Sequence, residues 1–389
     1  MPFCFLGDFA GIDFVVTNIF GNDYPYVFCQ QRNIVFLDFF IQHILYKLVR
    51  KNNMKTVVVF GATGNLGAYI ALHLKSQGYN VIGVGHRKND NKFFVDRGMH
   101  YHSVDIKDRK AFDVLPKEGI YAVAHFASSL PSRYAFDPVD LFDSITIGTL
   151  NVLEWMREVG CKKIVFPQTP SDMAKFHNNG SVIPCDATRH FPLTGDHAIY
   201  TIAKNAAVDL MEHYQAEYGF QFFALRFFTI YQYHPNAYHY ADFKRRMMPY
   251  RMLMDRASKS LPIEIWGNCK KAKEMVYIKD FVNLVQACIE SDLPGGCYNC
   301  GNGWQVSLEE QIKGIIEVFS PKENQSEIIY CQEKPDPLEN AFDMTKTFAD
   351  FPSYRPRYSY IDQLRDFKHE METEPMAQLW GVKEDYEKE

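Results

Sequence analysis

The run GATGNLG places three glycines, Gly61, Gly64 and Gly67, between an apolar stretch and an amphipathic one. The preceding residues KTVVVF predict a short buried strand from Lys55, and the pattern from about Asn65 to Gln77 predicts a helix. Glycines at such a junction allow a tight turn and a close approach of the backbone to a phosphate. The helix N-terminus then offers amide donors and a positive dipole end to an anion. An ordinary glycine-rich turn is the alternative, but the flanking elements favour a pyrophosphate-binding site.

Strands and helices alternate regularly after this turn. Strands separated by helices are typical of a parallel sheet. We therefore predict an α/β fold, a Rossmann-type doubly wound parallel sheet with a smaller C-terminal substrate-binding lobe. The expected strands cover 79–84, 100–104, 121–126, 163–166 and 221–227, and the expected long helices cover 141–159 and 200–218.

The length of 389 residues suits one large α/β domain with an appended lobe. Residues 1–53 are crowded with Phe, Ile, Asn and Tyr and precede Met54, a second plausible start, so this extension need not belong to the functional protein. We expect the nucleotide-binding domain over 54–230. The substrate-binding lobe is expected over 231–371, with contributions from 169–194, and a C-terminal tail over 372–389.

Composition excludes several other classes of protein. Hydrophobic residues make up 47% and charged residues 23%, as in soluble globular proteins, and the net charge of −5 argues against a nucleic-acid surface. The stretch 33–49 is apolar but carries interrupting polar residues, so no membrane span is expected, although a membrane-surface helix is an alternative. The nine cysteines lack a disulfide framework, which favours the cytoplasm. Cys297 and Cys300 lack a second ligand pair, so we expect structural thiols and no metal.

The end of the second strand distinguishes NAD from NADP, because an acidic residue there binds the ribose hydroxyls and repels a 2′-phosphate. Here Gly85 occupies the acidic place, and His86, Arg87 and Lys88 follow. This basic run favours NADP(H), with NAD(H) as the alternative, unless the run is only a solvated loop. Asp105, at the end of the third strand, is expected to close the adenine side of the pocket.

Tyr200 and Lys204 are four residues apart in a predicted helix, which puts both side chains on one face. A nearby ammonium favours the phenolate and is expected to lower the pKa of the tyrosine from about 10. Lysine can also hold the nicotinamide ribose. A hydroxyl at the end of the strand KKIVF can hydrogen-bond a substrate oxygen, and Thr169 is the best candidate there, with Ser171 as the second.

These motifs in this order resemble the extended short-chain dehydrogenase/reductase family, in its nucleotide-sugar epimerase and dehydratase branch. The resemblance covers about Lys55 to Met371 and is specific for the family but not for the substrate. Besides the glycine turn it rests on HFAS from His125, DP from Asp137, GTLNVLEWMREVGCKKIVF from Gly148, YTIAK from Tyr200, LRFFTIY from Leu225 and VYIKD from Val276.

The resemblance implies a homodimer and a set of site residues. Thr169, Tyr200 and Lys204 are expected to be catalytic. Substrate contacts are expected from Ser129, Ser171, Thr229 and Lys273. Besides Tyr200 and Lys204, cofactor contacts are expected from Gly61, Thr63, Gly64, Asn65, Leu66, Gly67, His86, Arg87, Asp105, Ile106 and Ala127.

Departures from the family pattern narrow the function. Dehydratases of this branch carry an Asp-Glu pair after the threonine, but Pro170 and Ser171 stand here, so 4,6-dehydration is disfavoured. Lys273 replaces an arginine that grips the nucleotide diphosphate, and lysine lacks the planar two-pronged donor set. Thr229 replaces a common asparagine, and Gln232 a glycine. Lys273 could still bind a pyrophosphate as a point charge, together with Lys244, Arg245 and Arg246.

Two functions remain open at this point. The first is an NAD(P)-dependent epimerase or reductase acting on a nucleotide-activated sugar, and the basic run at Gly85 to Lys88 slightly favours reduction. The second is a non-catalytic redox sensor or scaffold that keeps the dinucleotide fold. Intact Thr169, Tyr200 and Lys204 favour the enzyme, because a binding module needs none of the three.

Overall fold

The computed structural model describes residues 54–131, 137–241 and 244–387, and the strands 4–9, 12–17 and 26–29 of the N-terminal region. The chain divides into two compact units, Met1–Lys55 and Thr56–Glu389. The described part of the first unit is an antiparallel sheet of β1 (Cys4–Phe9), β2 (Ile12–Thr17) and β3 (Tyr26–Cys29) in that order. The stretch 33–49, with its alternative of a membrane-surface helix, lies outside the described residues. Within them, no helix has the length and apolarity needed to cross a membrane.

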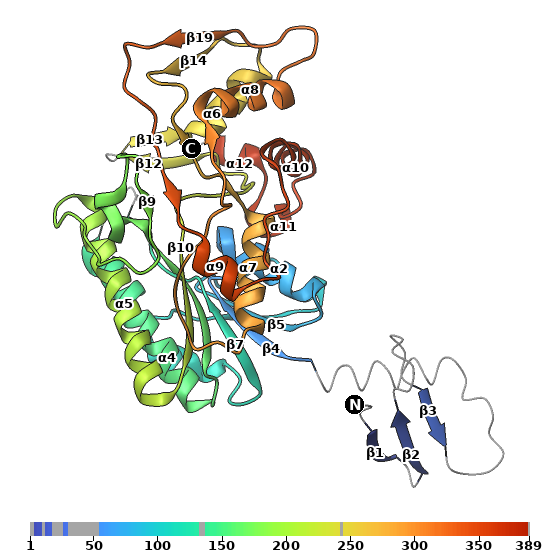
Figure 1. The fold of residues 1–389 in the computed structure, drawn as a ribbon. Coiled ribbons are helices and arrows are strands. Elements are labelled where there is room, and N and C mark those ends of the chain that lie inside the picture. The colour runs from blue at the N-terminus through green and yellow to red at the C-terminus, as the bar shows by residue number, and fades with distance from the viewer. Residues whose placement is uncertain are drawn as a thin grey trace. The chain divides into compact units, whose positions relative to one another are not determined.

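The second unit is built on a seven-stranded parallel sheet, which confirms the predicted fold (Figure 1). Its strand order is β17-β10-β8-β7-β4-β5-β6, so the direction of winding reverses at β4. Such a reversal is the point where doubly wound sheets bind their ligands. The strands are β4 (Thr56–Phe60), β5 (Asn80–Gly85), β6 (His100–Ser103), β7 (Ile120–His125), β8 (Lys163–Gln168), β10 (Gln221–Arg226) and β17 (Gly295–Asn299).

Helices cover both faces of the sheet, as the unbroken apolar run of β4 requires. Val57 and Val59 face one core and Val58 and Phe60 the other, and all four side chains are fully buried. The first face packs against α2 (Asn65–Ser76) and α7 (Ile278–Glu290). The second packs against α4 (Gly148–Glu158) and α5 (Asp196–Tyr218) (Figure 1). A helical lead-in to α4 consists of α3 (Pro138–Phe142) and one π-helical turn, η3 (Asp143–Ile147).

The second lobe is assembled from helices and short paired strands. Its helices are α6 (Pro249–Ser258), α8 (Leu308–Phe319), α9 (Thr345–Asp350) and α10 (Tyr360–Thr373). Its strand pairs are β11 (Ile230–Tyr231) with β16 (Val276–Tyr277), β12 (Tyr238–Ala241) with β13 (Lys244–Met247), β14 (Ile263–Trp266) with β19 (Ile328–Cys331), and β15 (Ala272–Lys273) with β18 (Val306–Ser307). In addition, β9 (Val182–Ile183) pairs with β20 (Ala341–Phe342), so part of 169–194 joins this later segment.

The boundary expected at residue 230 is not a clean division in space. The chain enters the second lobe after β10 but returns to the central sheet with α7, and β17 then pairs with β10. The sequence indicates a strand at Tyr298 and Asn299, but it did not assign this strand to the central sheet, because Gly295 and Gly296 at its start are typical of a turn. The segment 278–299 therefore belongs structurally to the nucleotide-binding domain.

The C-terminal stretch expected as a tail is partly helical and partly buried. It forms α11 (Ala377–Trp380) and α12 (Lys383–Glu387). Met376, Leu379 and Trp380 each expose less than 5% of their surface, with values of 3%, 3% and 4%. These three apolar side chains anchor the segment to the rest of the unit.

Candidate active site

The glycine turn is packed so closely that side chains would not fit. Gly61 has a φ of +82°, and a Cβ there would lie 2.6 Å from the carbonyl carbon of Phe126. A Cβ on Gly67 would lie 2.0 Å from the carbonyl oxygen of Gly61. Helix α2 begins directly at Asn65, and the first N–H groups of a helix have no acceptor within it. The turn thus offers a side-chain-free backbone surface with amide donors, which fits a pyrophosphate.

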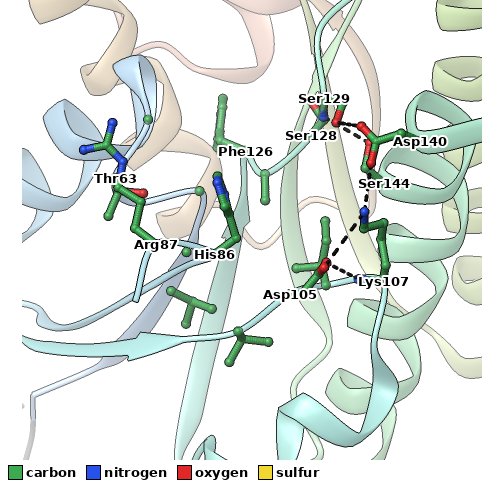
Figure 2. Close-up of a pocket in the computed structure, with 17 residues that line it drawn as sticks. Thr63, His86, Arg87, Asp105, Lys107, Phe126, Ser128, Ser129, Asp140 and Ser144 are labelled. Carbon is green, nitrogen blue, oxygen red and sulfur yellow. Dashed lines mark hydrogen bonds and ion pairs between the residues drawn. The ribbon is translucent and has the colours of Figure 1, made fainter. Parts of the chain in front are cut away.

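A cavity of about 290 Å³ opens beside this turn, at the carboxyl ends of β4, β5, β6 and β7 (Figure 2). It lies where the winding of the sheet reverses, the expected place for a dinucleotide. Eight of the residues predicted for the cofactor line it: Gly61, Thr63, Gly64, His86, Arg87, Asp105, Ile106 and Ala127. Asn65, Leu66, Gly67, Tyr200 and Lys204 do not line it, and their cofactor contacts remain predictions.

No acidic side chain directly follows β5 in the sequence. The space that a side chain at Gly85 would need is occupied by the side chains of Thr63 and Tyr101. A Cβ on Gly85 would lie 2.8 Å from the Thr63 hydroxyl oxygen and 3.1 Å from that of Tyr101. Tyr101 donates a 2.6 Å hydrogen bond to the carbonyl of Arg87, and burial raises the pKa of its phenol to about 12. The exposed Arg87 side chain donates from Nη1 to the carbonyl of Leu379 at 3.0 Å. Arg87 thus lines the cavity with its guanidinium group anchored to the backbone of Leu379.

The opposite wall carries a polar cluster that the sequence reasoning missed, apart from Asp105 and Ser129. Lys107 Nζ lies 2.8 Å from Asp140 Oδ1, and the Ser129 hydroxyl donates to Asp140 Oδ2 at 2.6 Å (Figure 2). The backbone N–H of Ser129 donates to the Ser144 hydroxyl oxygen at 3.1 Å. The hydrogen bond to Asp140 raises the pKa of Lys107. Ser129 thus lines the same cavity as the predicted cofactor residues, and its contact with substrate remains a prediction.

Tyr200 and Lys204 lie in the first half of α5, beside the end of β8. Lys204 exposes 2% of its surface, and its Nζ donates to the Pro167 carbonyl at 2.9 Å. The ammonium also lies 4.4 Å from the centre of the Phe166 ring and 5.7 Å from that of Tyr200. The two side chains are therefore neighbours, as their spacing predicts.

The electrostatics of this pair differ from the sequence-based expectation. Burial lowers the pKa of Lys204 to about 7, and burial raises the pKa of Tyr200 to about 12. The expected lowering of the Tyr200 pKa by Lys204 is therefore not seen in this structure. The physical reason is that the low-dielectric surroundings disfavour both charged forms, so the lysine carries less charge near neutral pH.

Thr169 follows β8 and caps η4 (Pro170–Phe176), a short 3-10 helix with a kink at Met173. Its hydroxyl oxygen accepts a 3.2 Å hydrogen bond from the N–H of Ser171, and 5% of its surface is exposed. Gln168 joins this strand end to α5 by donating to Asn205 Oδ1 at 3.0 Å. These contacts bring the Thr169 segment to the part of α5 that carries Lys204.

A buried ion pair holds the segment after Thr169 against the sheet. Arg226 at the end of β10 donates from Nε and Nη2 to the two carboxylate oxygens of Asp172, at 2.9 and 2.8 Å. Both side chains are buried, and Arg226 also donates to Asn299 of β17 at 3.2 Å. Two-pronged pairs of this kind fix orientation as well as distance. The ion pair therefore determines where η4, and Thr169 before it, lies.

The remaining substrate candidates are dispersed. Thr229 is exposed between β10 and β11, and Ser171 donates its N–H to Thr169. Lys273 is half-buried, and its Nζ lies 5.8 Å from the centre of the Tyr231 ring. It lines a separate cavity of about 140 Å³ inside the second lobe. A role for these three side chains at the substrate remains a prediction.

Three basic residues of β13, Lys244, Arg245 and Arg246, were further candidates for a pyrophosphate. Arg245 stacks on the Tyr238 ring with its guanidinium carbon 3.8 Å from the ring centre, and it donates to the carbonyl of Tyr386. It is thus engaged within the molecule, whereas Lys244 is exposed. Within the described ranges, no three His, Cys, Asp or Glu side chains gather as metal ligands would.

Comparison with known proteins agrees with this geometry. Residues 57–301 match the model of the NAD dependent epimerase/dehydratase family. A relative in Oryza sativa subsp. japonica, UDP-glucose 4-epimerase 2, is 25% identical over 340 residues, which cover 80% of this chain and 81% of that protein. UDP-glucose 4-epimerase of Lacticaseibacillus casei is 26% identical over 234 residues, covering 59% of this chain and 68% of its own.

Solved structures show the same fold. The UDP-glucose 4-epimerase of Thermus thermophilus, in complex with NAD, superimposes with a TM-score of 0.60 at 21% identity, covering 80% of this chain and 97% of its own. The UDP-Glc/GlcNAc 4-epimerase of Campylobacter jejuni has a TM-score of 0.64 at 15% identity, covering 81% and 99%.

Proposed function

The chain belongs to the NAD dependent epimerase/dehydratase family, and from this premise we propose that it epimerises a nucleotide-activated sugar by removing and returning a hydride. The observation that carries the proposal is the position of Lys204. Its Nζ lies 2.9 Å from the Pro167 carbonyl, two residues before Thr169, and 5.7 Å from the Tyr200 ring. The amine thus lies near the phenol ring and near the segment that carries the Thr169 hydroxyl, at the same edge of the sheet as the cavity beside the glycine turn.

Each of these groups has a role in the proposed reaction. Tyr200 takes the proton from a sugar hydroxyl during oxidation and returns it during reduction. Thr169 hydrogen-bonds the same oxygen while its charge changes. Lys204 holds the cofactor ribose and, when protonated, favours the phenolate of Tyr200. A bound nicotinamide supplies the hydride acceptor and donor.

We propose NADP(H) as the preferred cofactor, with NAD(H) as the alternative. The support is local: Gly85 ends β5 without a carboxylate, and Arg87 lines the cavity beside it. An arginine can bind a phosphate through two parallel hydrogen bonds. The same observation favours a second candidate function, a reductase that releases its product after one hydride transfer from free NADPH.

The sugar and its nucleotide are proposed from the relatives. The similar proteins are named for UDP-glucose or related UDP-sugars, so UDP-sugars are the first substrates to test. Dehydration at C4 and C6 is not proposed, because Pro170 and Ser171 cannot supply the two carboxyl groups that this reaction needs. A cytoplasmic homodimer stays a prediction, testable by fractionation and by light scattering.

The test incubates the full chain with UDP-glucose, UDP-galactose and their N-acetyl forms, without added reductant, and separates the sugars by chromatography. We expect conversion between a pair of C4 epimers. A parallel reaction with NADPH and carbonyl compounds, including a UDP-4-keto-sugar as hydride acceptor, follows absorbance at 340 nm, and stoichiometric consumption would favour the reductase. The absence of both epimer formation and NADPH oxidation across the panel would contradict both enzyme functions. This result would favour the non-catalytic sensor or scaffold.

A further inference from the structure

The last described residues reach back across the molecule to the glycine turn. We define residues 376–381, which include α11, as the C-terminal clasp. The clasp follows α10 of the second lobe and lies against α2 and the loop after β5, in the middle of the unit (Figure 1). None of the proposed catalytic steps uses it.

Trp380 connects the clasp to the phosphate-binding turn. Its indole Nε1 donates a 3.0 Å hydrogen bond to the carbonyl of Thr63, in the middle of GATGNLG. The indole is 4% exposed and packs against the rings of Tyr69 and His234, with ring centres 6.1 and 4.5 Å apart. The bond satisfies a buried carbonyl on the Thr63–Gly64 peptide, which restricts rotation of that peptide. The indole thus contacts the turn through the Thr63 carbonyl oxygen, whereas the donors of the proposed phosphate site are the backbone N–H groups in the first turn of α2.

Gln378 connects the clasp to the loop between β5 and β6. Its Nε2 donates to the Asn91 carbonyl at 2.9 Å and to Asp96 Oδ2 at 2.7 Å, and its Oε1 accepts from Arg97 Nη1 at 2.8 Å. Its backbone carbonyl accepts from Asn91 Nδ2 at 3.0 Å. Asn91 has a φ of +54°, in the left-handed region that asparagine adopts more readily than most other non-glycine residues.

The backbone of Leu379 completes these contacts by holding Arg87. The Leu379 carbonyl accepts from Arg87 Nη1 at 3.0 Å, which leaves Nη2 and Nε of the guanidinium for another acceptor. Arginine loses about 2 kcal/mol of side-chain conformational freedom when it is immobilised. An arginine that is held in advance pays less of this cost when it binds a phosphate.

We propose that the C-terminal clasp is a positioning element of the cofactor site. Trp380 keeps the phosphate-binding turn in its binding conformation, and Gln378 with the Leu379 carbonyl keeps Arg87 placed for a 2′-phosphate. Trp380 therefore affects the affinity for both NAD⁺ and NADP⁺, whereas Gln378 affects the ratio of the two affinities. The second effect rests on the proposed use of NADP(H), and the first does not.

The first experiment replaces Trp380 with Phe in the full chain and measures dissociation constants of NAD⁺ and NADP⁺ by calorimetry. The change keeps an aromatic ring but removes the donor to Thr63. Because one net hydrogen bond is worth about fivefold in an equilibrium, we expect both constants to rise about fivefold with their ratio unchanged. Trp266→Phe, on an indole that is 45% exposed in β14, is the matched control and should change neither constant.

The second experiment replaces Gln378 with Ala, with Gln215→Ala on the exposed surface of α5 as the matched control. We expect the NADP⁺ constant to rise about fivefold and the NAD⁺ constant by less than about twofold. Thermal unfolding shows whether each variant is folded, and hydrogen exchange over 61–68 reports on the turn itself. For Gln378→Ala, loss of packing alone would weaken binding of both dinucleotides equally, so the ratio of the two constants distinguishes positioning of Arg87 from general damage.

Arg87→Ala separates failure of the clasp from failure of the proposed cofactor. If it changes neither constant, the 2′-phosphate proposal fails, and the Trp380 result alone decides whether the clasp positions the turn. If Arg87→Ala weakens NADP⁺ but Gln378→Ala leaves the ratio unchanged, the discrimination by the clasp is overturned. A folded Trp380→Phe protein with both constants unchanged would overturn the positioning of the turn.

Discussion

The proposed dinucleotide cavity and the proposed catalytic end, which lie at the same edge of the sheet, differ in how they are built. The cavity is lined by glycines, by apolar side chains and by polar side chains that range from buried to exposed, and it encloses a space of about 290 Å³. At the catalytic end, Lys204 and Thr169 expose 2% and 5% of their surface. Burial there shifts the pKa of Lys204 down to about 7 and that of Tyr200 up to about 12.

The difference shows that the two ends respond to different kinds of change. Binding at the cavity is expected to depend on shape, because a Cβ on Gly61 or Gly67 would collide with neighbouring backbone. Chemistry at the catalytic end depends on a low dielectric, which makes proton affinities sensitive to each neighbouring charge. Substitutions at one end should therefore alter affinity, and substitutions at the other should alter rate.

The largest effect is expected for Tyr200→Phe. The ring packing remains, but the group that exchanges the substrate proton is lost, so turnover should fall about a hundred- to ten-thousand-fold. The dissociation constant of the cofactor should hardly change. Steady-state rates and calorimetry measure the two quantities, and Tyr218→Phe, on the exposed end of the same helix, is the control. Near-normal turnover of the variant would contradict the proposed mechanism.

The next effect concerns stability and comes from Lys204→Met. Burial lowers the pKa of the folded lysine from 10.5 to about 7, so the unfolded chain holds a proton that the folded chain holds only at a cost. This cost is fully present below pH 7 and disappears as the pH approaches 10.5. The variant should therefore gain about 2–4 kcal/mol near pH 7 and much less near pH 10.

Thermal unfolding of cofactor-free protein between pH 6 and 10 measures this gain, and turnover of the variant should be lost. Lys162→Met, at an exposed position before β8, is the control and should show no such pH dependence. A gain of equal size at every pH, or destabilisation throughout, would show that burial does not disfavour the charge of Lys204.

Gly61→Ala should weaken cofactor binding at the cavity without changing the rate of the chemical step. The new Cβ would collide with the Phe126 backbone at 2.6 Å, and a φ of +82° is unfavourable for alanine. Strain of about 1–3 kcal/mol should raise the dissociation constant of the cofactor about tenfold or more, with turnover restored at saturating cofactor. Gly160→Ala has a similar φ of +74° but nothing within 4 Å, so it isolates the collision. Equal losses in both variants would assign the effect to backbone strain alone.

The smallest effect is expected from removing residues 1–53. The division between the two compact units falls at Lys55, and the glycine turn and the proposed catalytic residues all follow it. The shortened protein should bind its cofactor within about twofold of the full chain, as expected for changes away from a site. Aggregation, or an affinity lowered severalfold, would make the N-terminal sheet an integral part of the folded protein.

Local sequence signals predicted the central sheet and the adjoining turn well. The VVVF run of β4 indicates a strand buried on both faces, and the spacing of Gly61, Gly64 and Gly67 indicates close backbone packing; both features are present. Each of these signals lies within a few residues of the structure that it predicts, so no knowledge of distant contacts was needed.

Features made by distant residues were not predictable in this way. Asp140 joins the cavity only because α3 packs beside the end of β7, where it meets Ser129. The pKa of Tyr200 depends on burial by the assembled fold, which the spacing to Lys204 does not reveal. Trp380 meets Thr63 across 317 positions of the chain, and a single tryptophan near the end of a sequence carries no periodic signal.

The contact between Trp380 and Thr63 also bears on how the protein matures. A ribosome makes the glycine turn early, but the indole that holds it is added more than three hundred residues later. The edge strand β17 likewise joins β10 only after the intervening lobe has been made. At about 5–20 residues per second, a nascent chain spends on the order of fifteen seconds to a minute with this turn unsupported. The phosphate-binding turn can therefore reach its supported conformation only after Trp380 has been made.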